Sequence, residues 1–483
     1  MFKKKILNLI KKNKIFTIIS KLSDKLNYKT YIIGGFTRNI FINKKNKIFD
    51  IDIVTTGDSY ILAKNFTNIL SIKKIFVFKR FKTVIVNYNN INIEFVSTRK
   101  EYYNLYNNKP YVKKLNNINE DQKRRDFTIN TIAINLNKKN FCKIIDPFNG
   151  IRDINKKIIK TPINPDKIYY DDPLRMIRAI RFATQLNFKI SKKSLKSIKK
   201  NKYRLRIISI ERINIEFNKI ILSNKPSKGI KLMYKLGFLN MYLPELLDLN
   251  KVKIINGFTY KNNFKHTLKV IDKISKYSNN LWLKWATLLH DIGKPVSKKF
   301  DNKKGWTFYN HEIIGSNMIN YIFYKLKLPI KKNIEYIKTI IKYSNISNIL
   351  INKEVKVSTI RKFIYKIGYN NIKDLLLLSK CDITTSNYKL KKEKEKNIKK
   401  LYNNIKTINS KDNINNIKLY INGNFIMKYF NIPQSKIIGI IKSKIKKHII
   451  EGKINNTFKD SINLMKILGK KIIKKYDKKK NKK

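Results

Sequence analysis

The spacing of apolar residues changes along this 483-residue chain and divides it into an α/β part and a helical part. Residues 1–27 place apolar side chains at helical intervals among lysines, which predicts an amphipathic helix. Between residue 28 and about residue 136, short β-branched and aromatic runs bounded by polar residues predict strands. Beyond residue 150 helical spacing dominates. The strand-like runs are YKTYIIGG, IFDIDIVT, KIFVFKRFKTVIV and INIEFVSTR.

These two patterns predict an α+β protein of several domains, because the chain is long enough for more than one core. The lysine-rich segment 389–400 is expected to be a linker or an exposed helix. The expected divisions are an α/β head at 1–160, a helical neck at 161–250, a helical region at 251–390 and a basic helical tail at 391–483.

The charge of the chain points to a polyanionic partner. Lys and Arg total 107 against 32 Asp and Glu, which gives a formal net charge of +75 and makes nucleic acid the first candidate. A bias of the whole composition toward Lys, Asn and Ile is the alternative explanation for much of this excess. Only thirteen of the basic residues are Arg, and nine of these lie between residues 124 and 212. Since only Arg offers a planar fork to phosphates and carboxylates, this clustering indicates a site there.

The cysteine count indicates a reducing environment. Two Cys, at 142 and 381, provide neither a disulfide framework nor a thiolate metal site. The basic N-terminus lacks the uninterrupted apolar core of a signal peptide, and no run is long enough to span a membrane. We therefore expect a cytoplasmic protein without a membrane partner.

The stretch FDIDIVTTG places two acids, Asp50 and Asp52, on a predicted strand. Residues i and i+2 of a strand share a face, so the two carboxylates repel one another. Two Mg²⁺ ions, roughly 3.5–4 Å apart in phosphoryl-transfer enzymes, would cancel that repulsion. Glu94, in the middle of NIEFVSTR, is the expected third acid. Taken alone, an Asp-x-Asp pair also occurs on surface strands and turns.

A strand that ends in two glycines precedes this acidic pair. In YIIGGFTRNI, Gly34 and Gly35 allow close approach to a phosphate, the following helix offers its N–H groups, and Arg38 could bind a phosphate oxygen. An ordinary strand–turn–helix is the alternative. A phosphate cradle and a metal pair at this spacing together indicate a nucleoside triphosphate.

Six motifs in the same order resemble those of the class II tRNA nucleotidyltransferases, which are CCA-adding enzymes of the polymerase-β-like superfamily and share their class with bacterial poly(A) polymerases. The resemblance covers about residues 28–250. It implies a polymerase-β-like head with a mixed sheet, an all-α neck, two Mg²⁺ ions, and addition of C, C and A to tRNA from CTP and ATP by a monomer or a dimer. The motifs are GGFTRNI…FDIDIVTTG, IEFVSTR, RRDFTINTIAIN, DPFNGIRDI, DDPLRMIRAIRF and ISIERINIEF.

The segment DDPLRMIRAIRF resembles the part of the family that selects the base. Asp172 is expected to cap a helix with Pro173 at its first position, and Arg175 lies one turn on, followed by Arg178. C and A share an amine donor beside an unprotonated ring nitrogen, whereas G and U present a carbonyl beside an N–H. A carboxylate and a guanidinium therefore complement only C and A. A helix-start salt bridge is the alternative.

The resemblance also assigns roles to neighbouring segments. Arg124, Arg125 and Asp126 match the motif that binds triphosphate and ribose, and residues 100–123, polar and without clear periodicity, match a flexible loop needed for the switch to A addition. The full length of this loop argues against an enzyme that stops at CC. Glu211 and Arg212 match a motif that braces the base-reading helix.

Three of the four histidines fall in one window. His266, the pair His290-Asp291, His311 and a later Asp382 follow one another as in an HD domain, which holds a divalent metal for phosphate-ester hydrolysis. A domain that has lost this activity and serves as a scaffold is the alternative. The basic tail resembles the region that grips the tRNA elbow in relatives, or is a merely cationic surface.

Three rival functions stay open from the sequence. One is a poly(A) polymerase of the same class. Another is a basic RNA-binding protein whose catalytic head is vestigial, against which the set Asp50, Asp52 and Arg175 argues. The last is an HD phosphohydrolase with an RNA-docking head, in which hydrolysis would survive loss of Asp50.

Overall fold

The computed structural model describes residues 2–42, 50–104, 107–251, 254–255, 258–259, 262–329, 331–351, 355–383, 387–412 and 417–480. The chain forms two compact units, which we describe separately: Met1–Pro244 with Leu326–Leu328, and Glu245–Lys325 with Pro329–Lys483. No helix in the described part of the chain is both long and apolar enough to cross a membrane.

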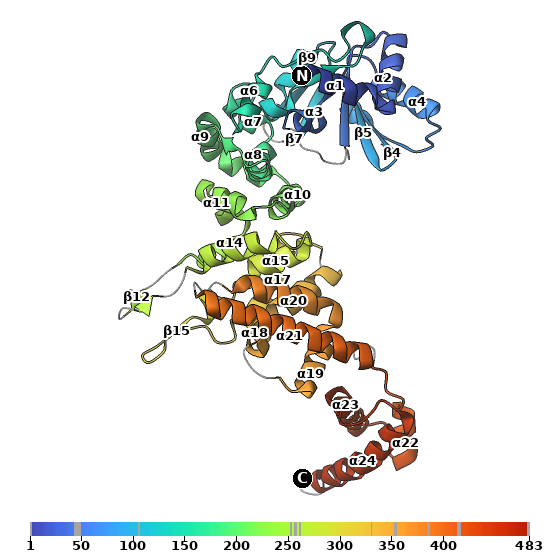
Figure 1. The fold of residues 1–483 in the computed structure, drawn as a ribbon, viewed down its shortest axis with the longest axis vertical. Coiled ribbons are helices and arrows are strands. Elements are labelled where there is room, and N and C mark those ends of the chain that lie inside the picture. The colour runs from blue at the N-terminus through green and yellow to red at the C-terminus, as the bar shows by residue number, and fades with distance from the viewer. Residues whose placement is uncertain are drawn as a thin grey trace. The chain divides into compact units, whose positions relative to one another are not determined.

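The head is built on one mixed seven-stranded sheet, as the sequence predicted (Figure 1). Its strand order is β3-β4-β5-β2-β1-β8-β9, in which β2 and β5 pair in parallel and the other neighbours are antiparallel. The strands are β1 (Thr30–Ile33), β2 (Asp50–Thr55), β3 (Ile75–Phe78), β4 (Thr83–Tyr88), β5 (Ile91–Ser97), β8 (Ala133–Asn135) and β9 (Ile144–Ile145).

Helices cover one face of this sheet and leave the acids on the other. Side chains such as Ile10, Phe16 and Phe66 from three helices join Ile53 and Phe95 from the strands in one core. Because alternate strand residues point to opposite faces, Asp50 and Asp52 lie away from this core. The helices are α1 (Phe2–Lys11), α2 (Lys14–Lys25) and α4 (Ser59–Ile69); α3 (Gly35–Phe41) follows β1.

Two local predictions need correction. Residues 1–27 form two helices, because the side chain of Asn13 accepts a hydrogen bond from the Ile15 N–H (3.0 Å) and starts a new helix. Residues 100–123, for which no periodicity predicted an element, form a hairpin of β6 (Arg99–Asn104) and β7 (Asn107–Lys114) followed by α5 (Ile118–Lys123). The hairpin strands pair only with each other, so no alternating apolar pattern marks them.

The neck helices pack in the same unit as the head. Helix α8 (Leu174–Gln185) is buried along most of its length between α10 (Ile210–Ile221) and α11 (Pro226–Leu236). Gly229 of α11 lies so close that an added Cβ would be 2.6 Å from the Thr184 hydroxyl. The remaining α-helices and strands described in this unit are α6 (Gly150–Asn155), β10 (Ile158–Ile159), α7 (Pro165–Asp171), β11 (Lys189–Ile190), α9 (Lys192–Asn201) and α12 (Phe238–Tyr242).

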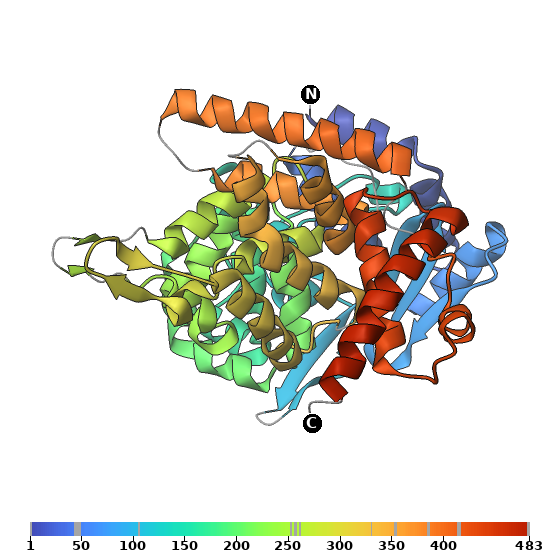
Figure 2. The same cartoon turned by 90° about the horizontal axis from the view of Figure 1, so that it is seen from below.

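The second unit is almost entirely helical. Its 25-residue helix α21 (Tyr388–Asp412), orange in Figure 2, contains the lysine-rich segment 389–400 and spans the division expected at residue 390. Ile426, Ile441 and Met465 centre a separate core in the tail. The other elements are α13 (Glu245–Asp248), β12 (Ile254–Ile255), β13 (Phe258–Thr259), α14 (Asn263–Ile274), α15 (Leu281–Leu289), α16 (Lys294–Ser297), β14 (Lys299–Asp301), β15 (Gly305–Thr307), α17 (His311–Lys325), α18 (Lys331–Ile351), α19 (Val357–Ile367), α20 (Tyr369–Asp382), α22 (Gly423–Phe430), α23 (Lys436–Glu451) and α24 (Phe458–Lys480).

Candidate active site

Three acids meet on two neighbouring strands of the head. In the parallel pairing of β2 with β5, Asp52 lies opposite Glu94 and Asp50 lies opposite Asn92, whose amide donates to Asp50 (3.3 Å). Burial raises the pKa of Asp52, an effect that the nearby Arg125 opposes. Burial, followed by the charge of Asp52, also raises the pKa of Glu94. A set of partly buried carboxylates that destabilise each other in this way fits a divalent cation.

The glycine turn closes tightly on Asp52. Gly34 has φ +80°, and a Cβ built on it would lie 2.1 Å from the Oδ2 of Asp52. The backbone N–H of Gly35 donates to the same carboxylate. The two glycines therefore hold a catalytic acid candidate in place, and their predicted contact with a phosphate stays a prediction.

Arg38 is engaged with protein groups at the end of this turn. Its guanidinium donates to the side chains of Asn130 (2.8 Å) and Asn39 (2.9 and 3.2 Å) and lies 5.1 Å from the centre of the Phe182 ring. Burial, reinforced by the positive charge of Arg181, lowers the pKa of Arg38 to about 10. The side chain is thus positioned between head and neck, while phosphate binding by it is untested.

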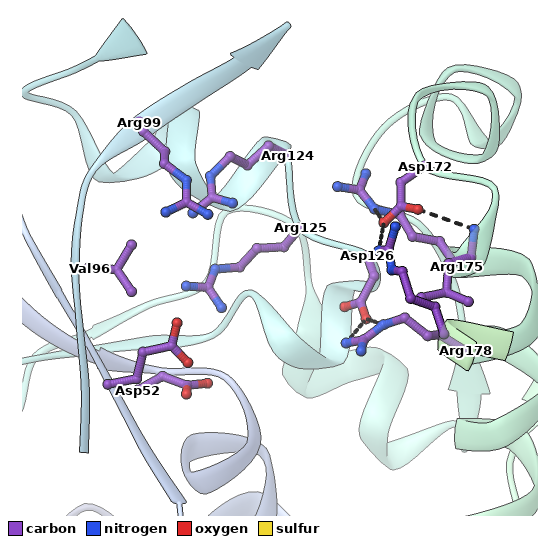
Figure 3. Close-up of a pocket in the computed structure, with 12 residues that line it drawn as sticks. Asp52, Val96, Arg99, Arg124, Arg125, Asp126, Asp172, Arg175 and Arg178 are labelled. Carbon is purple, nitrogen blue, oxygen red and sulfur yellow. Dashed lines mark hydrogen bonds and ion pairs between the residues drawn. The ribbon is translucent and has the colours of Figure 1, made fainter. Parts of the chain in front are cut away.

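One cavity of about 270 Å³ joins the acids of the sheet to the arginines of the neck (Figure 3). Asp52 and Glu94 lie at one wall, and Asp172 and Arg175 lie at another. Two of these residues were predicted for metal binding and two for base selection, so a single pocket brings both predicted sets together. The lining also includes Val96, Arg99, Arg124, Arg125, Asp126, Leu174, Arg178 and Arg212.

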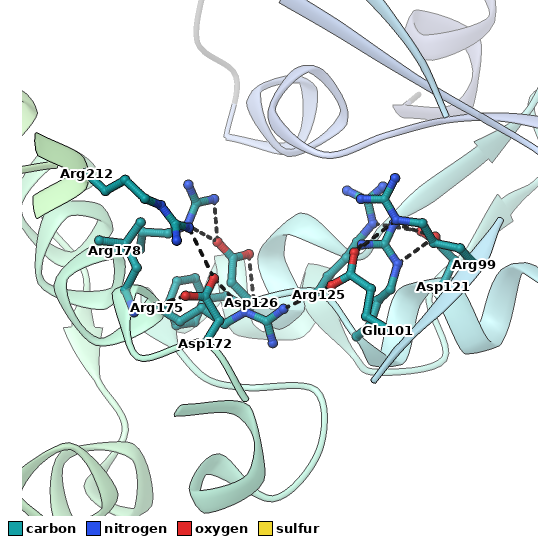
Figure 4. A network of polar contacts seen from close by, with 12 residues as sticks. Arg99, Glu101, Asp121, Arg125, Asp126, Asp172, Arg175, Arg178 and Arg212 are labelled. Carbon is teal, nitrogen blue, oxygen red and sulfur yellow. Dashed lines mark hydrogen bonds and ion pairs between the residues drawn. The ribbon is translucent and has the colours of Figure 1, made fainter. Parts of the chain in front are cut away.

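Two buried acids that the sequence did not single out hold the arginines of the head. Asp121 pairs with Arg124 (2.6 Å) and Arg125 (3.2 Å), and Glu101 accepts hydrogen bonds from Arg99 (2.9 Å) and Arg124 (2.8 Å). The spacing of Asp121 to Arg124 and Arg125 is i to i+3 and i+4, so helical spacing could have found this pair. No sequence pattern singles out Glu101, whose carboxylate extends from the hairpin toward these arginines (Figure 4).

The base-selecting pair of the prediction lies together at the start of α8. Asp172 accepts a hydrogen bond from the Leu174 N–H (3.2 Å), and its Oδ2 is 3.8 Å from the Nε of Arg175. The helix begins at Leu174, after Pro173. Arg212 approaches Asp172 to 3.9 Å.

The brace predicted for this helix needs correction. Glu211 is exposed and pairs with Lys327 (3.3 Å). The acid of α10 that pairs with α8 is Glu216, about one and a half turns further along, which lies 2.8 Å from Arg181 and 3.6 Å from Arg178. Glu216 is buried and Glu211 is not, so loss of the ion pairs of Glu216 should destabilise the fold more than loss of the Glu211 pair.

Asp126 and Arg178, both predicted to bind nucleotide, are partners of one another. Two hydrogen bonds of 2.9 and 2.7 Å join the Arg178 fork to one oxygen of Asp126, and Asn130 donates to the other (2.9 Å). Burial alone would raise the pKa of Asp126, but Arg178 and these hydrogen bonds hold it at about 2. The carboxylate is therefore ionised and joins the head to helix α8.

The second unit brings the predicted HD residues together. The ligand atoms of His266, His290 and Asp291 all lie within 4.8 Å of one another. Asp382 lies 2.7 Å from Nε2 of His266 and 3.5 Å from Nε2 of His290. His311 is further away, with its Nε2 3.9 Å from Asp291.

The orientation of the imidazoles suits a metal. Nδ1 of His290 lies 2.8 Å from the Thr287 carbonyl, so it carries the hydrogen and leaves the Nε2 lone pair facing Asp291 and Asp382. In the described structure this buried Nε2 has no hydrogen-bond partner. Burial would lower the pKa of His290, but the two carboxylates raise it to about 9, so a metal would bind at Nε2 by displacing a proton from that nitrogen. A divalent cation at this point would satisfy the lone pair and both acids.

The fold and the sites define a nucleotidyltransferase of the polymerase-β-like class followed by an HD domain. Family models agree: residues 30–160 match the "Poly A polymerase head domain", residues 187–249 the "Probable RNA and SrmB- binding site of polymerase A" and residues 263–364 the "HD domain". The chain belongs to the family of CCA-adding enzymes. The CCA-adding enzyme of Ligilactobacillus salivarius is 30% identical over 311 residues, which cover 64% of this chain and 69% of that one.

Other relatives align over a smaller share of their length. The chain is 34% identical to the CCA-adding enzyme of Pediococcus pentosaceus and 32% identical to that of Anoxybacillus flavithermus, over 48% and 59% of this chain. It spans only 56% and 64% of those two relatives. The fold is that of the Bacillus stearothermophilus CCA-adding enzyme solved with CTP (TM-score 0.68, 19% identity, 98% of this chain and all of that one).

Proposed function

We propose that the chain adds C, C and A to the 3′ end of tRNA, with CTP and ATP as substrates. The observation that carries this proposal is the single pocket in which Asp52 and Glu94 face Asp172 and Arg175. A nucleotide whose α-phosphate lies at the acids would place its base toward the pair on α8.

The tRNA 3′-hydroxyl attacks the α-phosphorus of the nucleotide, a P–O bond forms, the bond to the β-phosphate breaks, and pyrophosphate leaves. Asp50 and Asp52, with Glu94, would hold Mg²⁺, which supplies charge stabilisation to the attacking and leaving oxygens. The arginines around Asp121 would bind the triphosphate.

The pair on α8 would choose between bases without a template. The carboxylate of Asp172 accepts from the amine of C or A, and the guanidinium of Arg175 donates to the adjacent ring nitrogen. Glu101 lies 3.9 Å from Arg175, and Asp172 lies 3.8 Å from it, so carboxylates on two sides orient the guanidinium.

The rest of the chain would bind tRNA. The basic tail offers phosphate contacts that give affinity without reading sequence, and the hairpin at 99–114 occupies the position expected to act in the switch to A addition. We expect a cytoplasmic enzyme, acting as a monomer or a dimer.

Nucleotide incorporation on tRNA lacking its 3′ CCA tests this function. Each NTP is offered separately, then CTP with ATP. CTP alone should add two residues, and both together should end at CCA. Long A tails would indicate a poly(A) polymerase; addition of a single A only to tRNA ending in CC would indicate an A-adding enzyme, as the Geobacter sulfurreducens relative is named. Absence of Mg²⁺-dependent incorporation would favour an RNA-binding protein with a vestigial head.

We infer that the HD site is a second, metal-dependent phosphohydrolase centre, since His266, His290, Asp291 and Asp382 converge on one point. His290→Ala should lose a bound divalent metal, measured by mass spectrometry of the purified protein, while His448→Ala, the histidine outside the site, should keep it. Asp291→Ala should lose hydrolysis of phosphate esters and keep nucleotide addition. If the unmodified chain hydrolyses no phosphate ester with any divalent metal, the domain is a scaffold.

A further inference from the structure

A second pocket of the head lies across the sheet from the catalytic acids. It has a volume of about 410 Å³, between the first turn of α4 and the strands β3 and β4. Glu94 and Val96 of β5 line the active-site cavity, whereas Ser97 lines this one. Because neighbouring strand residues face opposite sides, the two cavities are separated by the sheet.

The walls of this second pocket are aromatic and aliphatic. Tyr60 and Phe78 contribute rings that are 41% and 47% exposed, and Val77 is 40% exposed. Exposed aromatic faces at the mouth of a cavity offer a stacking surface to another flat ring.

Several polar groups that line the pocket already form hydrogen bonds with the protein itself. The carboxylate of Asp58 caps helix α4 by accepting from the Tyr60 N–H (2.7 Å). The Ser59 hydroxyl donates to the Lys82 carbonyl (2.8 Å), and the Ser97 hydroxyl accepts from the Ser59 N–H (3.0 Å). The pocket is therefore suited to stacking rather than to reading hydrogen-bond patterns.

The pocket continues onto the free edge of the sheet. Strand β3 is the first in the strand order, and Phe76, Val77 and Phe78 expose 50%, 40% and 47% of their surface. Edge strands usually carry charged residues that prevent association with other chains. Three exposed apolar residues in a row therefore indicate a surface that binds a partner. In the pairing with β4, Val77 lies opposite Val84 and Phe76 lies opposite Ile85, so Phe76 lies on the other face of the strand from Val77. Phe78, at the end of the strand, lines the pocket.

Cations surround these rings. Lys79 and Lys82 line the pocket together with Tyr60 and Phe78. The acid at this pocket, Asp58, is the helix cap. Aromatic faces combined with nearby cations are the arrangement that binds single-stranded nucleic acid without sequence preference, with bases on the rings and phosphates on the cations.

We propose that the pocket between α4 and β3, with the rings of Tyr60 and Phe78 in its lining, binds an unpaired segment of RNA by base stacking. This site goes beyond the proposed function, because it lies on the opposite face of the sheet from the nucleotide pocket. The head would then bind single-stranded RNA at a site that is separate from the phosphate contacts of the helical regions.

Photo-crosslinking of the full chain tests this site. A short oligouridylate carrying one 4-thiouridine is irradiated with the protein at physiological ionic strength, and crosslinked peptides are mapped by mass spectrometry. We expect crosslinks between residues 76 and 82. Phe78→Ala should reduce the affinity of this site roughly 5- to 100-fold, the effect of losing one base–aromatic stack. Phe78→Trp should restore it, and Tyr324→Ala, which removes a 76% exposed ring outside the pocket, should leave it unchanged.

Three results would overturn the proposal. The first is a wild-type chain that crosslinks elsewhere but not at this segment. The second is a Phe78→Ala variant that crosslinks there equally well. The third is protection of the β3 amides from hydrogen exchange by an acidic, apolar peptide and not by RNA, which would mean that the edge binds protein by strand addition. Nucleotide addition is measured separately: a chain that adds no nucleotide but loses crosslinks with Phe78→Ala refutes the proposed function and supports this site.

Discussion

Replacing Gly34 by Ala should misplace Asp52, the proposed metal-binding acid, while leaving the head folded. The backbone at Gly34 has φ +80° and ψ −136°, a conformation that costs an L-residue on the order of 1–3 kcal/mol. The new Cβ would also lie 2.1 Å from the Asp52 Oδ2, so the carboxylate and the turn must separate by more than about 1 Å to reach ordinary contact. A displacement of about 1 Å at a reacting centre can reduce the rate roughly 100-fold.

Gly35→Ala provides the matched control. The φ of Gly35 is not left-handed, the nearest atom to its added Cβ is 3.8 Å away, and Ala keeps the N–H that donates to Asp52. We therefore expect Gly35→Ala to retain kcat within a few-fold, and Gly34→Ala to lose about 100-fold with a free energy of unfolding lower by about 1–3 kcal/mol. The assay is incorporation of radiolabelled CTP into tRNA lacking CCA, with thermal unfolding alongside. Equal activity of the two variants would show that the turn does not position the acid.

Three further changes test the neck and its contacts. Asp172→Ala should reduce the preference for CTP over UTP by about 1–3 kcal/mol in kcat/KM; an equal loss with all four nucleotides would mean that Asp172 only supports its helix. Glu216→Gln should lower the free energy of unfolding by about 3 kcal/mol, because it leaves the Arg181 guanidinium buried without its partner, whereas Glu211→Gln should change it by less than about 0.5 kcal/mol. Since the pKa of Asp126 is held at about 2, its contribution to stability is complete above the unfolded-state pKa and disappears as the pH falls through 2. Chemical unfolding should thus show a steeper loss between roughly pH 4 and 2 for the wild type than for Asp126→Asn, and parallel curves would contradict the pairing.

The sheet and its acids could be predicted from the sequence because their pattern is local. A strand that is buried on one face alternates apolar and other residues, so two acids two positions apart must share the open face. The strand run around Asp50 and Asp52 therefore predicted both β2 and the position of the carboxylates. The hairpin at 99–114 forms a two-stranded sheet, and on β6 the alternate residues Arg99 and Glu101 are charged and pair with one another. No apolar alternation marked its strands, so they could not be predicted in the same way.

The charge network could be predicted only where its partners are neighbours in sequence. Asp172 and Arg175 are three residues apart on the chain, and their contact follows from helical geometry. Asp126 and Arg178 are 52 residues apart, so only the packing of head against neck shows that they neutralise each other rather than a ligand. The motif assigned the brace to Glu211, but the buried acid of α10 is Glu216. Glu216 lies five positions after Glu211 in the sequence and therefore on a different side of the helix.

Residue rarity explains why the HD ligands were easier to find than these ion pairs. In a chain with 107 basic residues, an Arg or Lys near an acid carries little information, and many such pairs are solvated. Histidine occurs four times, so three histidines in one window limit the choice of ligands strongly. Sequence order alone could not separate His311 from the others, since its spacing is equally suitable. The structure gathers His266, His290 and Asp291 with their ligand atoms within 4.8 Å of one another, and the Nε2 of His311 approaches the same Asp291 to 3.9 Å.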